Sequence, residues 1–218
     1  MAKKKTEPPV PEEKLYTTLA GEGHAELIER KSQFLGHAAP VKTEEEALAF
    51  IAKIKHEYAD ATHNVFAYML EKNSIARYSD DGEPQGTAGI PVLDVIKKSG
   101  FIDAVIVVTR YFGGILLGAG GLVRAYSAAA RDAVAAAKIV TYELYAEIKV
   151  ECTYSDYQKL ENEFPRYGII VDGTDFGVGV TLNLAIKMKT LDEYALRLSE
   201  MSAGRLKPEK TGERYDFK

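Results

Sequence analysis

The sequence predicts a protein of the α+β class with two successive domains. The first observation is a β-branched run, "AVIVVT" at residues 104–109, followed by five glycines between Gly113 and Gly121 and then by "AYSAAARDAVAAAK". Such a run is typical of a buried strand, and the alanine-rich run indicates a helix. The second observation is a different order of short strands and helices downstream of Thr141, which indicates a second domain.

The first domain is expected to combine strand pairs with three helices. Thr43 followed by Glu46 forms a capping box, and Gly100 closes a helix that has Pro91 in its first turn. The strands are expected at residues 23–31, 33–41, 63–70, 74–79 and 103–109, with Asn73 near one turn. The helices are expected at residues 47–58, at 91–100, and from near Gly121 to about Lys138.

The second domain shows the order β-α-β-β-α-β. Ser155 with Gln158, and Thr190 with Glu193, are read as capping boxes, and Gly204 as a helix end. The strands are expected at residues 145–154, 168–173, 178–188 and within 205–218. One helical face is expected to carry Tyr157, Leu160, Phe164 and Tyr167, and Val178 is placed on the apolar side of its strand. This order is the ferredoxin-like pattern, which carries no function by itself.

Length and charge narrow the class of protein. The chain has 218 residues, a net charge of -4, and one cysteine, Cys152, so it can form no intramolecular disulfide. It has no overall positive charge that would attract nucleic acid, and no apolar run of the roughly 20 residues that a membrane span needs. We expect a cytoplasmic protein with a flexible tail over residues 1–14, a first domain over 15–139 and a second over 140–218.

The glycine stretch is the least ordinary part of the chain. It has no Walker A ending, and Val123 stands where a dinucleotide-binding loop needs its third glycine. Glycines still allow a ligand to approach the backbone, and a helix that starts there offers unpaired N–H groups to an anion. Arg110 and Arg124 bracket the stretch and would add contacts to a phosphate. The other interpretation is a tight turn with close helix–sheet packing.

A second dense stretch, "RYSDDGEPQGTAG", covers residues 77–89 and holds Asp80, Asp81 and Glu83 within four positions. Neighbouring carboxylates on a turn can hold Mg²⁺ together with a phosphate. They can equally cap the next helix, or pair with Arg77, Arg110 or Arg124. Both interpretations stay open.

Histidines and aromatic residues complete the candidates. His63, next to Asn64 at a strand start, is either a base or a hydrogen-bonded structural residue. Tyr111, Phe112 and Tyr126 flank the glycines and would stack on bases if exposed. The histidine spacing matches no metal site, and no catalytic cysteine or nucleophile elbow is present.

Three segments together resemble the YigZ/IMPACT family: "HN" at 63–64, "YSDDGEPQGTAGIPVL" at 78–93 and "VVTRYFGGILLGAGGLVRAYSAA" at 107–129. The resemblance implies a first domain similar to the second domain of ribosomal protein S5. It implies a second domain similar to the last domain of elongation factor G. It also implies a link to translation, because the eukaryotic IMPACT proteins are translational regulators.

The residues on the family's signature mix charges with glycines, as a surface site does. They are Arg77, Asp80, Asp81, Glu83, Gly86, Thr87, Arg110, Gly113, Gly114, Gly118, Gly120, Gly121, Arg124 and Tyr126. We expect these residues and Tyr111 to form one binding site, with His63 and Asn64 as accessories.

Three functions follow. The first is a binding module linked to regulation of translation, which needs no cofactor and binds RNA, the ribosome, or a phosphate-bearing or acidic partner through Arg110 and Arg124. The second is a Mg²⁺-dependent enzyme acting on a phosphorylated small molecule or nucleotide, with the carboxylates of residues 80–83 on the metal and His63 as base. The third is an interaction scaffold whose glycine loop is purely structural.

Overall fold

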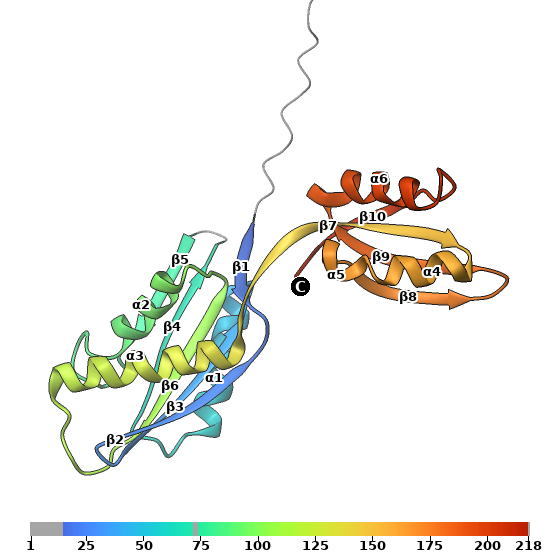
Figure 1. Ribbon diagram of the computed structural model, residues 1–218. Coiled ribbons are helices and arrows are strands. Elements are labelled where there is room, and N and C mark those ends of the chain that lie inside the picture. Colours follow the sequence, from blue (N-terminus) through green and yellow to red (C-terminus); the bar gives the residue numbers. More distant parts are fainter. Residues whose placement is uncertain (1–14, 72–73, 218) are drawn as a thin grey trace, which may run out of the picture. The chain divides into compact units, whose positions relative to one another are not determined.

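The computed structural model describes residues 15–71 and 74–217 (Figure 1). These residues form two compact units, one from Tyr16 to Thr141 and the other from Tyr142 onward. The expected tail at residues 1–14 and the turn residue Asn73 lie outside the described residues. No helix in the described part of the chain is both long and apolar enough to cross a membrane.

One antiparallel sheet of five strands runs through the first unit in the order β2–β3–β6–β4–β5. Its strands are β2 (Gly23–Glu29), β3 (Ser32–Pro40), β4 (His63–Leu70), β5 (Ile75–Ser79) and β6 (Ala104–Tyr111). The β-branched strand β6 lies in the centre, and every residue of it from Ala104 to Arg110 is buried. The sequence predicted this central strand from the same unbroken run.

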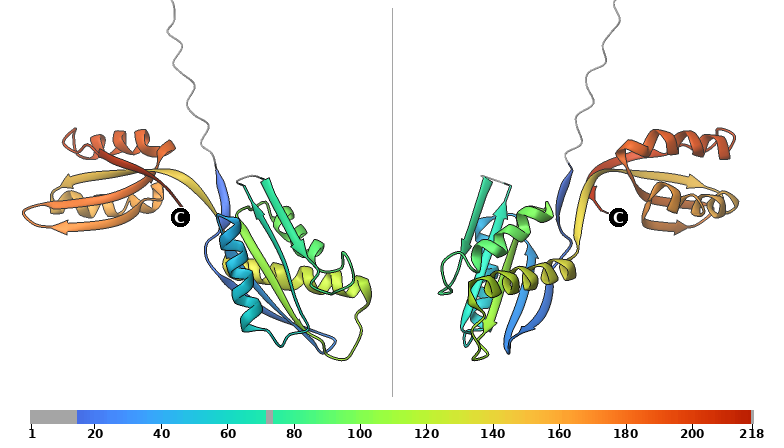
Figure 2. Two further views of the ribbon diagram at one scale, coloured as in Figure 1. Left: turned by 180° about the vertical axis from the view of Figure 1, so that it is seen from behind. Right: turned by 60° about the vertical axis from the view of Figure 1, so that its left-hand side comes forward.

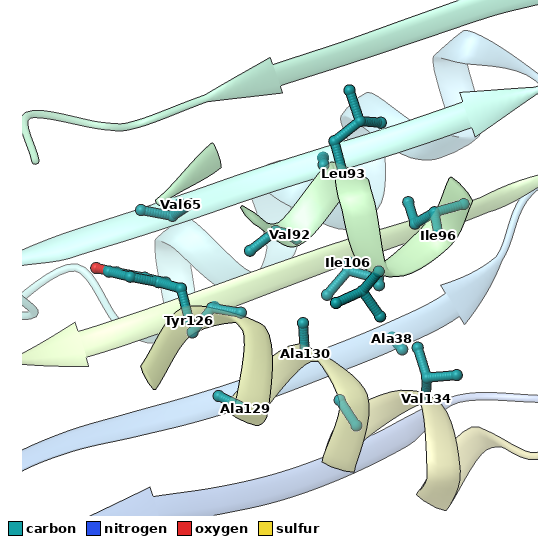
Figure 3. Packing of buried hydrophobic residues seen from close by; sticks show 14 of the residues in the cluster. Ala38, Val65, Val92, Leu93, Ile96, Ile106, Tyr126, Ala129, Ala130 and Val134 are labelled. Atoms are coloured by element: carbon teal, nitrogen blue, oxygen red, sulfur yellow. The ribbon is translucent and has the colours of Figure 1, made fainter. Parts of the chain in front are cut away.

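Helices cover both faces of this sheet, as the views in Figures 1 and 2 show. One face carries α1 (Glu44–Glu57), and the other carries α2 (Gly89–Ser99) and α3 (Gly118–Ala137). Because side chains alternate along a strand, the even-numbered residues of β6 pack under α2 and α3 and the odd-numbered ones under α1. Figure 3 shows Tyr126, Ala130 and Val134 of α3 packed with residues of α2 and the sheet.

The alanine-rich helix α3 packs very close to the sheet. A Cβ on Gly23 would lie 2.2 Å from the Ala137 backbone nitrogen, and one on Gly36 would lie 2.4 Å from the Ala129 carbonyl oxygen. Only glycine fits at either position, since real atoms do not approach so closely. The small residues of β2, β3 and α3 therefore set the distance between helix and sheet.

The second unit has the expected β-α-β-β-α-β order. Its elements are β7 (Ile139–Cys152), α4 (Tyr154–Glu161), α5 (Phe164–Tyr167), β8 (Ile170–Phe176), β9 (Val180–Lys187), α6 (Leu191–Met201) and β10 (Glu209–Asp216). A single turn of 3₁₀ helix, Met188–Thr190, precedes α6. The strand order is β10–β7–β9–β8, and β1 (Tyr16–Leu19) also pairs with β7. The predicted α+β class is confirmed.

Several local predictions need correction. The helix α3 begins at Gly118 rather than near Gly121, so three of the five glycines belong to its first turn. The single helix expected after residue 154 is two short ones, because Pro165 has no N–H to continue the ladder of hydrogen bonds. Val178 lies in the β8–β9 turn and is fully exposed instead of facing the core.

Two predicted capping boxes are also wrong. The helix α4 is capped by Thr153, whose hydroxyl accepts from the Asp156 N–H, rather than by Ser155. The Thr190 hydroxyl donates to the Lys187 carbonyl and leaves α6 without a side-chain cap. The Thr43 cap of α1 is confirmed, since its hydroxyl accepts from the Glu46 N–H at 3.2 Å.

Candidate functional site

The conspicuous residues of the sequence meet at one end of the central strands. His63 at the start of β4 lies opposite Arg110 near the end of β6 in the sheet register. The loop between β5 and α2 carries Glu83 to the same place, and the glycine loop leads from β6 to α3. Arg110 points to the face covered by α3 because it continues the even-numbered side of β6.

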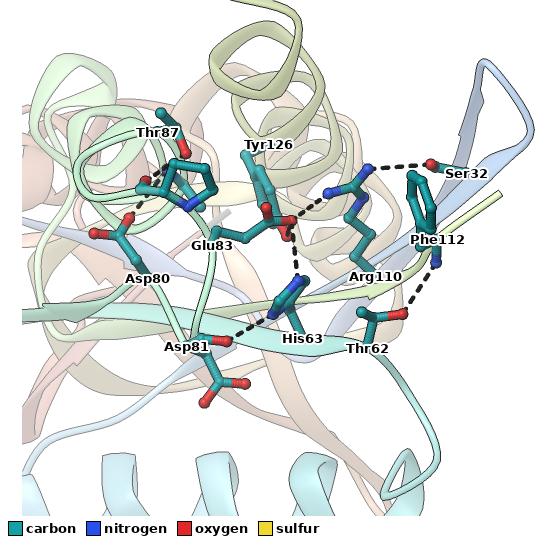
Figure 4. Close-up of polar contacts among 12 residues, drawn as sticks. Ser32, Thr62, His63, Asp80, Asp81, Glu83, Thr87, Arg110, Phe112 and Tyr126 are labelled. Carbon is teal, nitrogen blue, oxygen red and sulfur yellow. Dashed lines mark hydrogen bonds and ion pairs between the residues drawn. The ribbon is translucent and has the colours of Figure 1, made fainter. Parts of the chain in front are cut away.

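A buried ion pair lies at the centre of this site. Arg110 Nη1 donates to Glu83 Oε1 at 2.5 Å, and the Tyr126 hydroxyl of α3 donates to the same oxygen at 2.7 Å. The side chains of Arg110 and Glu83 are only 6% and 3% exposed (Figure 4). Burial, followed by the charge of Glu83, raises the pKa of Tyr126 well above its usual range. Removing either charge would leave the other buried and unpaired, which is strongly destabilising.

Other groups also contact the guanidinium of Arg110, whose buried Nε has no hydrogen-bond partner among the described residues. It lies between the rings of Phe34 and Phe112, each centred 5.4 Å from its Cζ atom, an arrangement in which the ring faces attract the cation. Its Nη2 donates to the Ser32 hydroxyl, which also accepts from the Gly113 N–H at 3.2 Å. A Cβ on Gly113 would lie 2.0 Å from the Lys31 backbone, so glycine is required here by close approach of two chain segments.

One of the two ring nitrogens of His63 already has a hydrogen-bond partner in the protein. Its Nδ1 lies 2.7 Å from the Asp81 carbonyl oxygen, so this nitrogen carries the proton that is donated. The Nε2 atom lies 3.8 Å from Glu83 Oε1. When the ring is neutral, Nε2 therefore bears the free lone pair; when the ring is protonated, it forms an ion pair with Glu83.

The three carboxylates of residues 80–83 do not converge. Asp80 accepts from the backbone N–H groups of Gly86, Ala88 and Gly89 and so caps the start of α2. Asp81 Oδ1 pairs with Lys55 Nζ at 2.7 Å. In Figure 4 both aspartate carboxylates point away from the Glu83–Arg110 pair.

Asp81 has a second backbone role, as its Oδ2 accepts from the Asn64 N–H at 2.6 Å. Partial burial acts to raise the pKa of Asp81, but the hydrogen bonds from Lys55 and Asn64 outweigh burial and lower it. Within the described ranges no three His, Cys, Asp or Glu residues are grouped so as to hold a metal ion. The carboxylates are used by the protein itself, which agrees with the capping and pairing interpretation of this loop.

A hollow of about 420 Å³ opens beside the ion pair. Its lining combines the polar floor with an apolar wall and the start of α3. The lining residues are Thr62, His63, Gly82, Glu83, Pro84, Arg110, Phe112, Leu116, Leu117, Gly118, Ala119 and Leu122.

No described side chain caps the N-terminus of α3, and its first turn contains no acidic residue. Its first N–H groups therefore remain available to a ligand. Gly114 and Gly118, with φ of 80° and 71°, shape the approach to them in a backbone conformation that favours glycine.

The structure places some predicted residues in the hollow and others away from it. Arg124 is exposed on α3, and its Nη1 lies 3.6 Å from where a Cβ on Gly120 would be, so its guanidinium lies over the first turn. Tyr111 points to the opposite face of the sheet, where its hydroxyl donates to Asp60. Arg77 is exposed on β5 and contacts the carbonyl of its own neighbour, Ala76.

The remaining predicted residues are structural. Thr87 is buried, and its hydroxyl donates to the Pro84 carbonyl within the loop. Asn64 joins strands, since its side-chain oxygen accepts from the Thr109 hydroxyl at 2.6 Å. Gly121 belongs to the first turn of α3, where a Cβ would lie 2.9 Å from that of Leu117.

The candidate set drawn from the sequence misses part of the lining. Leu116 and Leu117 lie between the glycines and line the hollow. Because a simple turn does not require apolar residues, their presence in a glycine loop could have indicated a binding surface. Phe112, which flanks the glycines, also lines the hollow and does not belong to the predicted set. Ser32 and Lys55 carry no local signal, as their contacts depend on strand register and on the path of the loop after β5.

Comparison with known proteins agrees with this organisation. The Impact N-terminal domain matches residues 30–134, and a domain of unknown function (DUF1949) matches residues 150–205. The two matches define a two-domain protein whose first domain is an Impact N-terminal domain.

Full-length relatives extend the match. IMPACT family member YvyE of Bacillus subtilis is 37% identical over 87% of this chain and 88% of its own length. IMPACT family member YigZ of Escherichia coli is 32% identical over 81% and 88%. A crystal structure described as that of a hypothetical protein is 29% identical, with a TM-score of 0.56 over 91% of this chain and 98% of that chain. The chain belongs to the IMPACT family.

Proposed function

We propose that this chain is a binding module in the regulation of translation that holds an anionic group of its partner at the hollow beside α3. The partner class is the ribosome, RNA, or a phosphate-bearing or acidic protein. Membership of the IMPACT family supports the link to translation, since the eukaryotic members that the sequence resembles are translational regulators.

The observation that carries the proposal is the start of α3 at the wall of the hollow. A helix of 20 residues begins there without a capping side chain or an acidic residue among those described. Unpaired N–H groups and the helix dipole favour an anion at such a position. Gly118 and Ala119 line the hollow itself, so these groups face a space that a ligand can occupy.

The two arginines have different roles in this proposal. Arg110 is neutralised by Glu83, so it shapes the floor rather than contributing a free charge. Arg124 is exposed over the first turn and forms no ion pair with the residues described. It is therefore the cation available to a bound phosphate or carboxylate.

The test uses a substitution that should stabilise α3 and weaken the binding of an anion. Ala119→Glu places a negative charge in the first turn, at the wall of the hollow. Such a charge stabilises a helix by roughly 0.3–1 kcal/mol and repels an anion. Ala135→Glu makes the same change at an exposed position near the other end of α3. Both variants and the unchanged protein would be sedimented with ribosomes and free subunits at low and near-physiological salt.

We expect the unchanged protein and Ala135→Glu to sediment alike and Ala119→Glu to lose roughly tenfold or more in affinity, as expected for one lost charge-assisted contact. Arg124→Ala should show a smaller loss and a flatter dependence on salt. Equal sedimentation of all variants, or no sedimentation of the unchanged protein at either salt, would contradict the proposal.

A further inference from the structure

We propose that the hollow is a nucleotide pocket that prefers a base with an exocyclic amino group, with the phosphate at the first turn of α3. This inference rests on the proposed function, because it names the group bound at the same site. A free nucleotide and an unpaired nucleotide of RNA share this chemistry.

The floor of the hollow offers hydrogen-bond acceptors to a ligand. Glu83 lines the hollow with a side chain that is only 3% exposed, and its Oε1 takes the bonds from Arg110 and Tyr126. None of the described residues donates a hydrogen bond to its Oε2. Oε2 is therefore an acceptor that a donor from a ligand in the hollow can pair with.

His63 adds a second acceptor to the floor. It also lines the hollow, and its Nδ1 is committed to the Asp81 carbonyl. The neutral ring therefore presents Nε2 as an acceptor. An amino group, which carries two protons on one nitrogen, matches a pair of acceptors, and carboxylates accept from the N4 amino group of cytosine in known recognition.

The wall suits a flat ring. Phe112, a residue that is 45% exposed, lines the hollow, and the Arg110 guanidinium lies against its ring. Leu117 and Leu122 supply further apolar surface. Bases stack on aromatic side chains with a gain of about 1–3 kcal/mol each. The volume of about 420 Å³ falls in the range of small-ligand pockets.

The polar ends of the hollow together select a nucleotide over a simpler anion. Inorganic phosphate or an acidic side chain matches the start of α3 but gives no donor to Glu83 Oε2. A nucleotide with an amino group matches both ends. Uracil presents its N–H between two carbonyl oxygens, which would face the Glu83 carboxylate unfavourably.

The test titrates the full chain with CMP, UMP, inorganic phosphate, a polyglutamate peptide and a short cytidine oligonucleotide. Affinity is measured by calorimetry, and the location by NMR shifts of the amides of Gly118, Ala119, Gly120 and Gly121. We expect CMP to bind roughly tenfold more tightly than UMP, within the range for one good base contact. A tighter oligonucleotide would assign the site to RNA, and a tighter CMP to the free nucleotide; both outcomes support the proposal.

Two variants test the contributions of the wall and of the floor to binding separately. Phe112→Leu removes the flat ring at an exposed position and should weaken CMP and UMP equally, by roughly tenfold. Phe176→Leu is the control, because Phe176 is 60% exposed on β8 of the second unit. Glu83→Gln turns one acceptor into a donor and should bring the ratio of CMP to UMP affinity close to one; its folding is checked by circular dichroism.

Equal affinity for CMP and UMP in the unchanged protein would overturn the inference. So would phosphate or polyglutamate binding as tightly as CMP, or nucleotide shifts that leave the α3 amides unmoved. If ribosome sedimentation is still lost in Ala119→Glu, these outcomes leave the proposed function standing. If sedimentation is absent as well, both fail together.

Discussion

The contribution of the buried hydrogen-bond network to stability can be measured by removing a single group, the Tyr126 hydroxyl. Tyr126→Phe removes its hydrogen bond to Glu83 Oε1 and nothing else. Because a buried bond to a charged acceptor contributes about 1.5–3 kcal/mol, the free energy of unfolding should fall by about that amount. Denaturant titration measures it, and Tyr111→Phe is the control, since that hydroxyl reaches Asp60 in solvent. A loss of equal size in both variants would show that the network is no stronger than a surface contact.

His37 provides a second prediction for a single residue, this time on pH. Burial, and then the charge of the neighbouring His24, lower the pKa of His37 to about 4. The folded protein therefore binds this proton less readily than the unfolded chain, whose histidines titrate near about 6.5. Stability is full above that pH and falls as the pH drops toward about 4.

Two measurements check this sign. NMR titration should show the His37 ring still neutral at about pH 5, where an ordinary histidine is charged. His37→Leu should lose less stability than the unchanged protein between about pH 6.5 and 4. A His37 ring that titrates near the ordinary histidine value of about 6.5 would contradict the prediction.

Among the elements, α2 depends on a carboxylate from outside the helix. Its N-cap residue, Ala88, has no side chain that can accept, and Asp80 instead accepts from three backbone N–H groups. Asp80→Ala should lower the free energy of unfolding by about 1–2 kcal/mol, as for other lost caps, and raise hydrogen exchange at the start of α2. Asp80→Asn keeps one acceptor and should lose less.

The same variants test the metal interpretation of the acidic loop. Because Asp80 is occupied by backbone groups, Mg²⁺ should leave the melting temperature of the unchanged protein and of Asp80→Ala unaltered. A Mg²⁺-dependent rise in the unchanged protein that disappears in Asp80→Ala would favour the enzyme hypothesis instead.

The elements also show what the sequence can predict. Strand β6 and the Thr43 cap follow from local patterns, so the sequence located them correctly. The caps at Ser155 and Thr190 failed because a hydroxyl followed by an acidic or amide residue says nothing about where the preceding strand ends. The start of α3 was placed late because glycines disfavour helix, and tertiary packing overrides that preference.

The candidate site was predictable in part for a related reason. Sequence proximity brings the glycine loop next to α3, and Gly118 and Arg110 line the same hollow. Which carboxylate would pair with Arg110 depended on the path of the loop after β5, which carries Glu83 inward and leaves Asp80 and Asp81 with other partners. Alternation along β6 sent Tyr111 to the opposite face, a consequence that only the strand register fixes.

At the scale of the whole molecule, the chain has separate cores on either side of the boundary at Thr141 and Tyr142. The core of the second unit is built mainly from β7, β9 and the helices α4 to α6, and it shares no residue with the two clusters that pack on the sheet of the first unit. Strand β7 begins in one unit and continues into the other. Separate cores joined by one strand should lose stability separately.

Paired core variants test that independence. Leu198→Ala in α6 and Ile106→Ala in β6 each remove a fully buried side chain, which costs about 2–5 kcal/mol. Hydrogen exchange should accelerate in β9 for the first variant while β6 keeps its protection, and the reverse should hold for the second. If either variant accelerates exchange equally in β6 and β9, the two units unfold as one, and ligand binding at the hollow would then stabilise the second unit too.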